Sequence, residues 1–351
     1  MGLRSATRTF GAGLGLFVAS SAFAASSAVS METSEAEAVL AILNKQAAGE
    51  EVGDADWRAL FDSRPYVRLK ARESAMKRAF SDEEFRAFVR SPELVARARE
   101  LREALDRWKA FDLAAPVARA SAYLSPGTAL RATIYPVIKP KTNSFVFEVD
   151  TDPAIFMYLD PADSPEKLAN TLAHELHHIG FGTLCPAPDI AEAIASMPDR
   201  VAWVVTRLGA FGEGLAMLAA AGGPDEHPHA VSSQPVRERW DRDVSRVAED
   251  MKLLERFMFD ASAGKLSPED RQARFFSFFG EQGPWYTVGW LMASTIEREL
   301  GRDVLIAAFC DPRQLLGTFN RAAISANGRG GAPLPLWSDD TLRLARGTPA
   351  E

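Results

Sequence analysis

The chain has 351 residues, 47% hydrophobic and 25% charged, which is an ordinary globular balance and enough for one large domain or two smaller ones. Its formal net charge of -7 lacks the basic excess that nucleic-acid binding requires, so we expect no nucleic-acid partner.

Residues 1–24 have the pattern of a secretory signal peptide. Arg4 and Arg8 form a positive start, an apolar run follows at 10–18, and Ala22-Phe23-Ala24 is a small-residue cleavage site. A membrane anchor is the alternative, but the run is short and rich in Gly, Ala and Ser. We expect cleavage after Ala24, a periplasmic or secreted protein, and no later bilayer span.

The next region is predicted to be helical. Residues 25–34 are rich in Ala and Ser and are predicted to be disordered. From 35 to about 111, apolar residues recur at helical spacing on a highly charged surface. Pro116 then marks a change. The prediction is an N-terminal helical region over 25–115.

Three strand-like segments follow, at 132–138, 144–149 and 154–159. They are β-branched and aromatic, with turn residues between them. They predict a small sheet over the helix that comes next in the chain. An edge of this sheet could take up an extended peptide as an added strand, or the sheet could simply cover the helix; both can hold.

The helix after these strands carries the motif H-E-x-x-H at 174–178. Ser164 is a good N-cap, Pro165 suits the first helical position, and a leucine stripe gives an apolar back. Gly180 and Gly182 predict its end. Residues four apart lie on one helical face, so the imidazoles of His174 and His178 can reach one metal ion.

Glu175 lies about 100° round the helix from His174, close enough to contact a water on the metal without being a ligand. Three of the five histidines fall within this stretch, at 174, 177 and 178. Zinc held by two histidines, a third protein ligand and an open position is a hydrolytic site, so Zn²⁺ is the predicted cofactor. His177 points off the ligand face and is expected to be buried or to support the ligands.

The chain then returns to helix until Gly-Arg-Gly-Gly at 328–331, where a loose tail is expected. Single helices are predicted over 200–221 and 236–262, among others. Only Cys185 and Cys310 occur; in an exported protein they can pair, or both can stay free thiols. The expected divisions are 1–24, 25–115, a catalytic domain at 116–325, and a tail at 326–351.

Two histidines rarely hold zinc alone, so a third ligand is needed. A third histidine at the metzincin spacing is excluded, because Leu184 stands there. Glu213 is the best candidate, since Gly212 and Gly214 flank it and small residues follow that let its helix approach the metal helix. Glu192 is the second choice. Two further histidines of a Pro-rich loop are expected at the surface, with a metal or transition-state role as the alternative: His227 and His229.

The motif at 174–178, followed by a helical Glu213-Gly-Leu-Ala and a later Tyr286-x-x-Gly289, resembles the gluzincin metallopeptidases. More narrowly, it resembles bacterial families described only as zinc-dependent peptidases. The resemblance covers roughly residues 130–320 and implies an α+β, mostly α, zincin-like fold. In that fold a small β-sheet packs on the active-site helix, with a helical C-terminal lobe across a cleft. The spacing of 35 residues from His178 to Glu213 is longer than in thermolysin-like enzymes and implies an inserted helix.

The resemblance also implies peptide hydrolysis, with a peptide or protein as the substrate. Glu175 would be the general base, and His174, His178 and Glu213 the metal ligands. Tyr286 is the candidate donor to the oxyanion, with a core aromatic as the alternative. Two other functions stay open: a non-catalytic zinc-binding protein of the cell envelope, and a metal-dependent hydrolase of a non-peptide substrate. Endo- or exo-cleavage is also left open.

Overall fold

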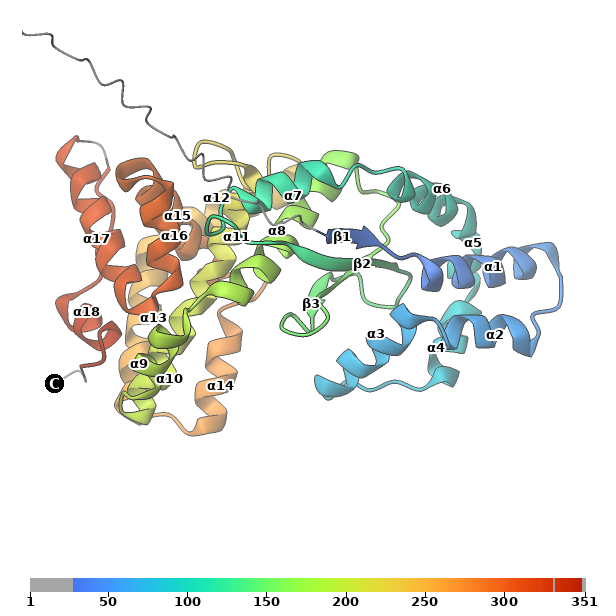
Figure 1. Ribbon diagram of the computed structural model, residues 1–351, viewed down its shortest axis with the longest axis horizontal. Helices are drawn as coiled ribbons and strands as arrows, with labels where there is room; N and C mark the ends of the chain where they lie inside the picture. The colour runs from blue at the N-terminus through green and yellow to red at the C-terminus, as the bar shows by residue number, and fades with distance from the viewer. Residues whose placement is uncertain (1–27, 331, 349–351) are drawn as a thin grey trace, which may run out of the picture.

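The computed structural model describes residues 28–330 and 332–348. The predicted signal peptide lies outside the described residues. Helices dominate, around one small mixed sheet (Figure 1). The N-terminal helices lie at one end of the molecule and the C-terminal helices at the other, with the sheet and α8, the helix of the H-E-x-x-H motif, between them (Figure 1). The fold is therefore α+β and mostly α, as the sequence predicts.

The sheet has four strands in the order β1-β2-β4-β3. The strands are β1 (Ala28–Met31), β2 (Arg131–Val137), β3 (Phe145–Phe147) and β4 (Ala154–Tyr158). β1 and β4 run parallel to β2, whereas β3 is antiparallel to β4 and forms an edge. Three strands match the segments predicted from the sequence. The prediction of disorder over 25–34 is wrong for β1, whose ladder with β2 supplies order that its Ala/Ser composition does not indicate.

Each face of the sheet has its own core. Ile134, Ile155 and Met157 point into the larger one, which also contains the leucine stripe of α8 and the N-terminal helices. Tyr135 and Phe156 point to the opposite face, where Leu69 covers them. This alternation is what a strand pleat requires when both faces are buried. The sheet thereby fixes the back of α8.

Between residue 28 and β2, seven helices share that larger core. They are α1 (Ser34–Ala48), α2 (Asp54–Phe61), α3 (Arg64–Ala75), α4 (Asp82–Val89), α5 (Pro92–Ala96), α6 (Ala98–Lys109) and α7 (Ala114–Ser121). Buried side chains of α1 and α6 pack in one cluster with those of β2, β4 and α8. The boundary at 115/116 stays a prediction.

The helix α8 (Pro165–Leu184) starts as predicted, with the Ser164 hydroxyl accepting a hydrogen bond from the Lys167 N–H. It continues past both glycines that were expected to end it. Gly180 lies inside the helix, where a Cβ would come within 2.3 Å of the Leu124 side chain and 2.7 Å of the Leu130 side chain. Its role is therefore close packing against the segment before β2.

A second core fills the C-terminal lobe. Its helices are α9 (Pro188–Ala195), α10 (Asp199–Arg207), a 3₁₀ turn (Leu208–Phe211), α11 (Gly212–Ala221), α12 (Gln234–Ser245), α13 (Val247–Ser262), α14 (Pro268–Ser277), α15 (Pro284–Leu300), α16 (Arg302–Cys310), α17 (Pro312–Gly328) and α18 (Asp339–Ala345). The helices expected over 200–221 and 236–262 are each divided. The expected loose tail is ordered over 332–348, because Trp337 and Leu344 are buried in this core.

One stretch of this lobe, Asp199–Ala221, has the length and mean hydropathy (1.3) of a membrane span. The sequence analysis predicts no such stretch beyond the signal. In the structure 67% of its most apolar 18-residue segment is buried inside the protein, as in the core helix of a globular domain.

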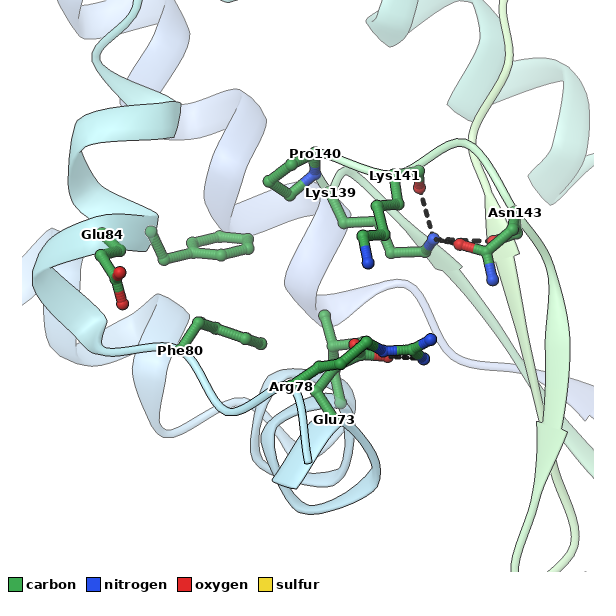
Figure 2. A pocket seen from close by; sticks show the side chains of 10 residues that line it. Glu73, Arg78, Phe80, Glu84, Lys139, Pro140, Lys141 and Asn143 are labelled. Carbon is green, nitrogen blue, oxygen red and sulfur yellow. Dashed lines mark hydrogen bonds and ion pairs between the residues drawn. The ribbon is translucent and has the colours of Figure 1, made fainter. Parts of the chain in front are cut away.

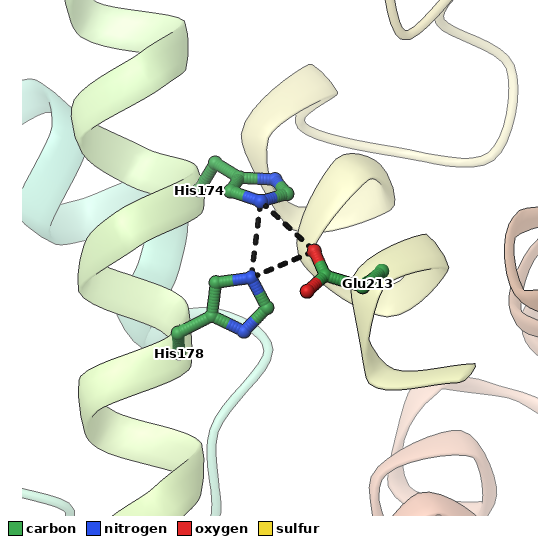
Figure 3. Close-up of side chains that lie close together, drawn as sticks. All are labelled: His174, His178 and Glu213. Atoms are coloured by element: carbon green, nitrogen blue, oxygen red, sulfur yellow. Dashed lines mark hydrogen bonds and ion pairs between the residues drawn. The ribbon is translucent and has the colours of Figure 1, made fainter. Parts of the chain in front are cut away.

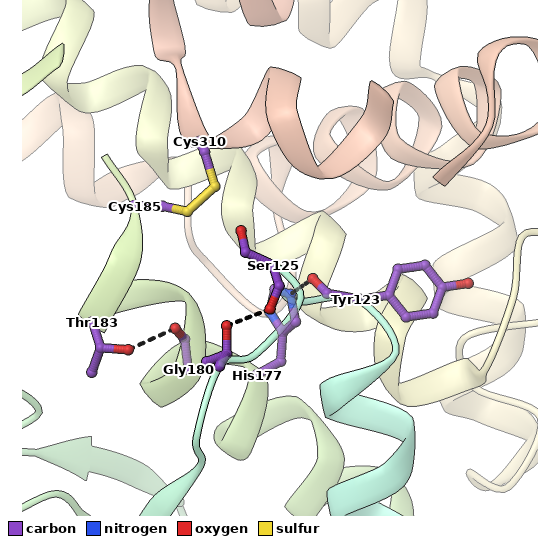
Figure 4. The surroundings of a disulfide bond; sticks show 8 residues. Tyr123, Ser125, His177, Gly180, Thr183, Cys185 and Cys310 are labelled. Atoms are coloured by element: carbon purple, nitrogen blue, oxygen red, sulfur yellow. Dashed lines mark hydrogen bonds between the residues drawn. A yellow bond between two sulfur atoms is a disulfide. The ribbon is translucent and has the colours of Figure 1, made fainter. Parts of the chain in front are cut away.

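A disulfide joins Cys185, just after α8, to Cys310 at the end of α16 (Figure 4). Of the two alternatives that the sequence left open, the structure therefore has the paired one. The bond links the C-terminal end of the motif helix to the C-terminal lobe.

Candidate metal centre

Three side chains from two helices converge on one point (Figure 3). His174 and His178 project from one face of α8, one turn apart, and Glu213 projects toward them from the first turn of α11. The Nε2 atoms of the two histidines lie 3.0 Å apart. The Glu213 Oε2 atom lies 3.1 Å from the His178 Nε2 and 3.4 Å from the His174 Nε2.

These spacings fit a tetrahedral zinc site. Ligand atoms bound tetrahedrally at 2.0–2.1 Å from zinc are about 3.3 Å from one another. The three observed separations, 3.0, 3.1 and 3.4 Å, are close to that edge length. Two histidines and one carboxylate are also a donor set found in catalytic zinc sites, with a fourth position left for water. The residues present therefore fit the metal that the sequence predicts.

Charge in the cluster is arranged as an ion pair. Burial disfavours the charged form of His178, but the Glu213 carboxylate outweighs it and raises the pKa of His178 to about 9. Burial also opposes ionisation of Glu213, and the two histidines outweigh it, holding the pKa of Glu213 well below its usual range. Without a metal, a proton on His178 thus balances the carboxylate.

Glu175 lines the same cleft as His174 but is not part of the three-atom cluster. Burial raises the pKa of its carboxyl, with the neighbouring Glu213 acting in the same direction and the two histidines against it. A raised pKa suits a carboxylate that must accept a proton near neutral pH. The role of Glu175 as general base stays a prediction.

Tyr286 is placed by the start of α15. Its ring lies nearly parallel to that of His174, with 6.5 Å between the ring centroids, and it lines the cleft. Burial, together with the carboxylates of Glu213 and Glu175, raises its pKa, so the phenol keeps its proton. Trp285 beside it is 1% exposed and belongs to the core. Tyr286 itself is half-buried, and its role as a donor to the oxyanion stays a prediction.

Glycines set the position of Glu213. A Cβ on Gly214 would lie 2.0 Å from the Trp290 backbone nitrogen, and one on Gly289 would lie 2.5 Å from the Phe211 carbonyl oxygen. α11 and α15 therefore cross in backbone contact at these two glycines. The sequence suggested that the small residues served an approach to the motif helix; the closest approach is to α15.

His177 is buried, as expected, and its Nε2 lies 3.3 Å from the Tyr123 carbonyl oxygen. Burial and the two neighbouring histidines lower its pKa to about 3, so it is neutral and donates this bond. The Tyr123 hydroxyl reaches across to Glu297 of α15, at 2.9 Å from its Oε2. Figure 4 shows the contact of His177, on the motif helix, with the carbonyl oxygen of Tyr123, in the segment after α7. It ties α8 to the helix that carries Tyr286.

A cleft of about 410 Å³ opens in front of the cluster. One wall comes from the loop before β3, β4 and the first half of α8, and the other from α11, α12 and the turns before α12 and α15. Uncharged hydrogen-bonding side chains are common in it, including Ser144, Asn170, Thr171, Ser232 and Gln282.

The other residues that the sequence analysis considered as ligands lie outside the three-residue cluster, and one of them lines the cleft. Glu192 is exposed on α9 and is not among the clustered residues. His227 pairs with Asp241 at 3.0 Å. His229 was expected at the surface but is 6% exposed and lines the cleft, because its ring packs on Trp240. Sequence reasoning missed Gln282, which no motif marks.

A second cavity, of about 190 Å³, lies between α3, α4 and the loop at 139–143 (Figure 2). Inside the loop, the Lys139 ammonium donates to the carbonyl oxygens of Lys141 and Asn143 and to the Asn143 side-chain oxygen, the last at 2.9 Å. These bonds brace the loop that presents Thr142 and Ser144 to the metal cleft.

Comparison with known proteins gives one match. A family model described as "Putative zinc dependent peptidase (DUF5700)" matches residues 57–328. No curated protein and no solved structure matches the chain. The match includes all the residues of the candidate centre and begins within the N-terminal helices.

Proposed function

The chain belongs to the family described as putative zinc dependent peptidases, and from this premise we propose that it is a gluzincin-type zinc metallopeptidase. In this proposal His174, His178 and Glu213 hold Zn²⁺. The observation that carries it is the spacing of the three ligand atoms, 3.0 to 3.4 Å, which suits one tetrahedral ion.

Bound zinc would supply a water of lowered pKa and a Lewis acid for the scissile carbonyl. With the metal bound, Glu175 would be the proton acceptor for the attacking water and would pass the proton to the leaving amine, a transfer that its raised pKa favours. Tyr286, which stays protonated, donates a hydrogen bond to the negative charge that develops on the carbonyl oxygen. The protein thus provides a base and a donor beside the metal.

The substrate in this proposal is a peptide or protein lying in the cleft. β3 pairs with β4 alone among the described strands, so its other edge has free backbone groups. Ser144, directly before β3, lines the cleft. An extended peptide can add to such an edge as a further strand, which brings a main-chain carbonyl past the metal.

Export is part of the proposal. The sequence of residues 1–24 favours a cleaved signal, and the Cys185–Cys310 disulfide supports an oxidising compartment such as the periplasm or the exterior.

The test uses purified protein with its zinc content measured. We expect hydrolysis of casein or a peptide library, loss of hydrolysis with a chelator, and recovery with added zinc. Glu175→Gln should keep the zinc and lower kcat by at least about 10²-fold, because the proton acceptor is gone while the ligands remain.

Each rival function has its own outcome. Bound zinc without cleavage of any peptide indicates a non-catalytic zinc protein. Chelator-sensitive cleavage of esters or other non-peptide substrates alone indicates a different hydrolase. Unchanged turnover in Glu175→Gln contradicts the assigned base.

A further inference from the structure

The turn between α14 and α15 holds a glutamine in an unfavourable backbone conformation. Gln282 has φ = +65°, in the left-handed region that side chains other than glycine rarely adopt. Among the described residues, only Lys77 and Glu148 share this property outside glycine. Such strain is found where the surrounding structure imposes it, often at functional sites. A glycine would fit here without strain, so the side chain itself needs an explanation.

The turn around Gln282 is tight and specific. The Gly283 N–H donates to the Phe279 carbonyl oxygen at 2.6 Å, and a Cβ on Gly283 would lie 2.6 Å from the Phe278 carbonyl oxygen. Gly283 is also the N-cap of α15, the helix that carries Tyr286 in its first turn. The same turn therefore positions Tyr286 and directs Gln282 into the cleft.

A second polar group lies beside it. His229 is 6% exposed, its Nδ1 contacts the Ser232 hydroxyl at 3.1 Å, and its Nε2 has no hydrogen-bond partner within residues 28–330 and 332–348. Burial lowers the pKa of His229 to about 4, with His227 and Arg239 acting in the same direction and a weak contact with the Gln282 side chain acting in the opposite direction. A buried polar atom without a partner costs free energy, so a ligand that completes its hydrogen bonding binds well.

The cations that line the cleft already have acidic partners. Lys167 lies 3.8 Å from Asp163, and Arg239 lies 2.5 Å from Glu281. Recognition of a free C-terminal carboxylate calls for an unpaired cation, and no lysine or arginine in the described lining is one. An amide, by contrast, offers one acceptor and two donors, which match the C=O and N–H groups of a peptide main chain.

We propose that Gln282, with His229 beside it, binds the main chain of a peptide, so that the site does not require a free C-terminal carboxylate on its substrate. This inference rests on the proposed peptidase function and adds the substrate class and a binding residue to it. Main-chain recognition is independent of side chains, so it positions many sequences across the metal. It does not use the C-terminal carboxylate.

The experiment compares zinc-loaded wild type with Gln282→Gly and with Lys77→Gly as a matched control. Both changes remove a side chain from a left-handed position, but Lys77, in the turn after α3, is exposed and does not line the cleft. We expect both variants to keep the wild-type zinc content and to unfold at or above the wild-type temperature. Gln282→Gly should raise KM about three- to tenfold with kcat within twofold, because ground-state and transition-state binding are lost alike. Lys77→Gly should leave KM unchanged.

Each peptide is also tested with a free and with an amidated C-terminus. Rates within twofold of each other are expected for a site that binds the main chain and not the C-terminal carboxylate. A wild-type KM in Gln282→Gly, or a loss of more than tenfold on amidation, overturns the inference while leaving the peptidase function in place. If zinc-loaded wild type cleaves no peptide at all, the proposed function fails, and this inference fails with it.

Discussion

At the residue scale, the centre holds a proton where it would hold a metal. His178 has its pKa raised to about 9 by Glu213, and Glu213 has its own lowered by the histidines. A histidine must be neutral to bind zinc, so the metal has to displace this proton. The carboxylate that attracts the proton is also the one that would attract the ion.

Zinc affinity should therefore depend on pH. Because the folded pKa of His178 lies above its ordinary value of 6.5, the proton is bound below about pH 9 and lost above it. We expect the apparent affinity to rise about tenfold per pH unit between 6.5 and 8.5. Competition with a chelator of known pH dependence measures this. An affinity that does not change over that range contradicts a proton on His178.

At the element scale, the site is made by three helices whose spacing depends on glycines. In the proposed mechanism α8 supplies two ligands and the base, α11 supplies Glu213, and α15 supplies Tyr286. α11 is held against α15 where Gly214 and Gly289 meet. The neighbouring Glu213 is thus positioned by backbone contact, which side-chain rotation cannot relieve.

Replacing Gly214 should consequently disturb the metal centre. In Gly214→Ala the new Cβ would lie 2.0 Å from the Trp290 backbone nitrogen, so α11 must move and Glu213 with it. We expect a loss of about 1–3 kcal/mol in unfolding free energy and reduced zinc content at limiting zinc. Elemental analysis and denaturant unfolding measure the two effects.

Gly212→Ala is the control, because it flanks Glu213 on the other side and its Cβ would meet no atom within 4 Å. Equal zinc content and stability in the two alanine variants would show that the crossing does not position Glu213.

At the scale of the whole molecule, two hydrophobic cores meet at the motif helix. One face of α8 packs in the core of the sheet and the N-terminal helices, and another face contacts α11 of the C-terminal lobe. The Cys185–Cys310 bond and the contact of Tyr123 with Glu297 hold the lobe against it. The cleft between them keeps its geometry only while these connections last.

Removing the disulfide should loosen this junction. The bond closes a loop of 125 residues, for which the chain-entropy model gives about 5 kcal/mol. In a chain of this size we expect Cys185→Ser/Cys310→Ser to unfold about 5–10 °C lower than wild type. Scanning calorimetry at one fixed scan rate, in zinc-loaded protein, makes the comparison. Titration of two free thiols in unfolded, unreduced wild type would remove the premise.

Local signals made much of this fold predictable. The cap at Ser164 and the leucine stripe predict α8, since capping and helical periodicity act over a few residues. The three strands before it are predicted by β-branched and aromatic runs between turn residues. The placement of His174, Glu175 and His178 on one helix follows from the spacing alone.

Other features depend on contacts between distant segments. β1 is ordered by its ladder with β2 a hundred residues away, and Trp337 by a core that the tail enters late. His229 is buried because Trp240 covers it, and the strain at Gln282 arises from the turn around it. Neither the burial of His229 nor the strain at Gln282 can be predicted from the residue type or from the spacing of apolar residues along the sequence.

The sequence by itself determined which side chains share the face of the motif helix, because helical geometry is local. Only the tertiary structure decided that Glu213, 35 residues after His178, lies 3.1 Å from it, because that separation depends on where two glycines let α11 and α15 cross.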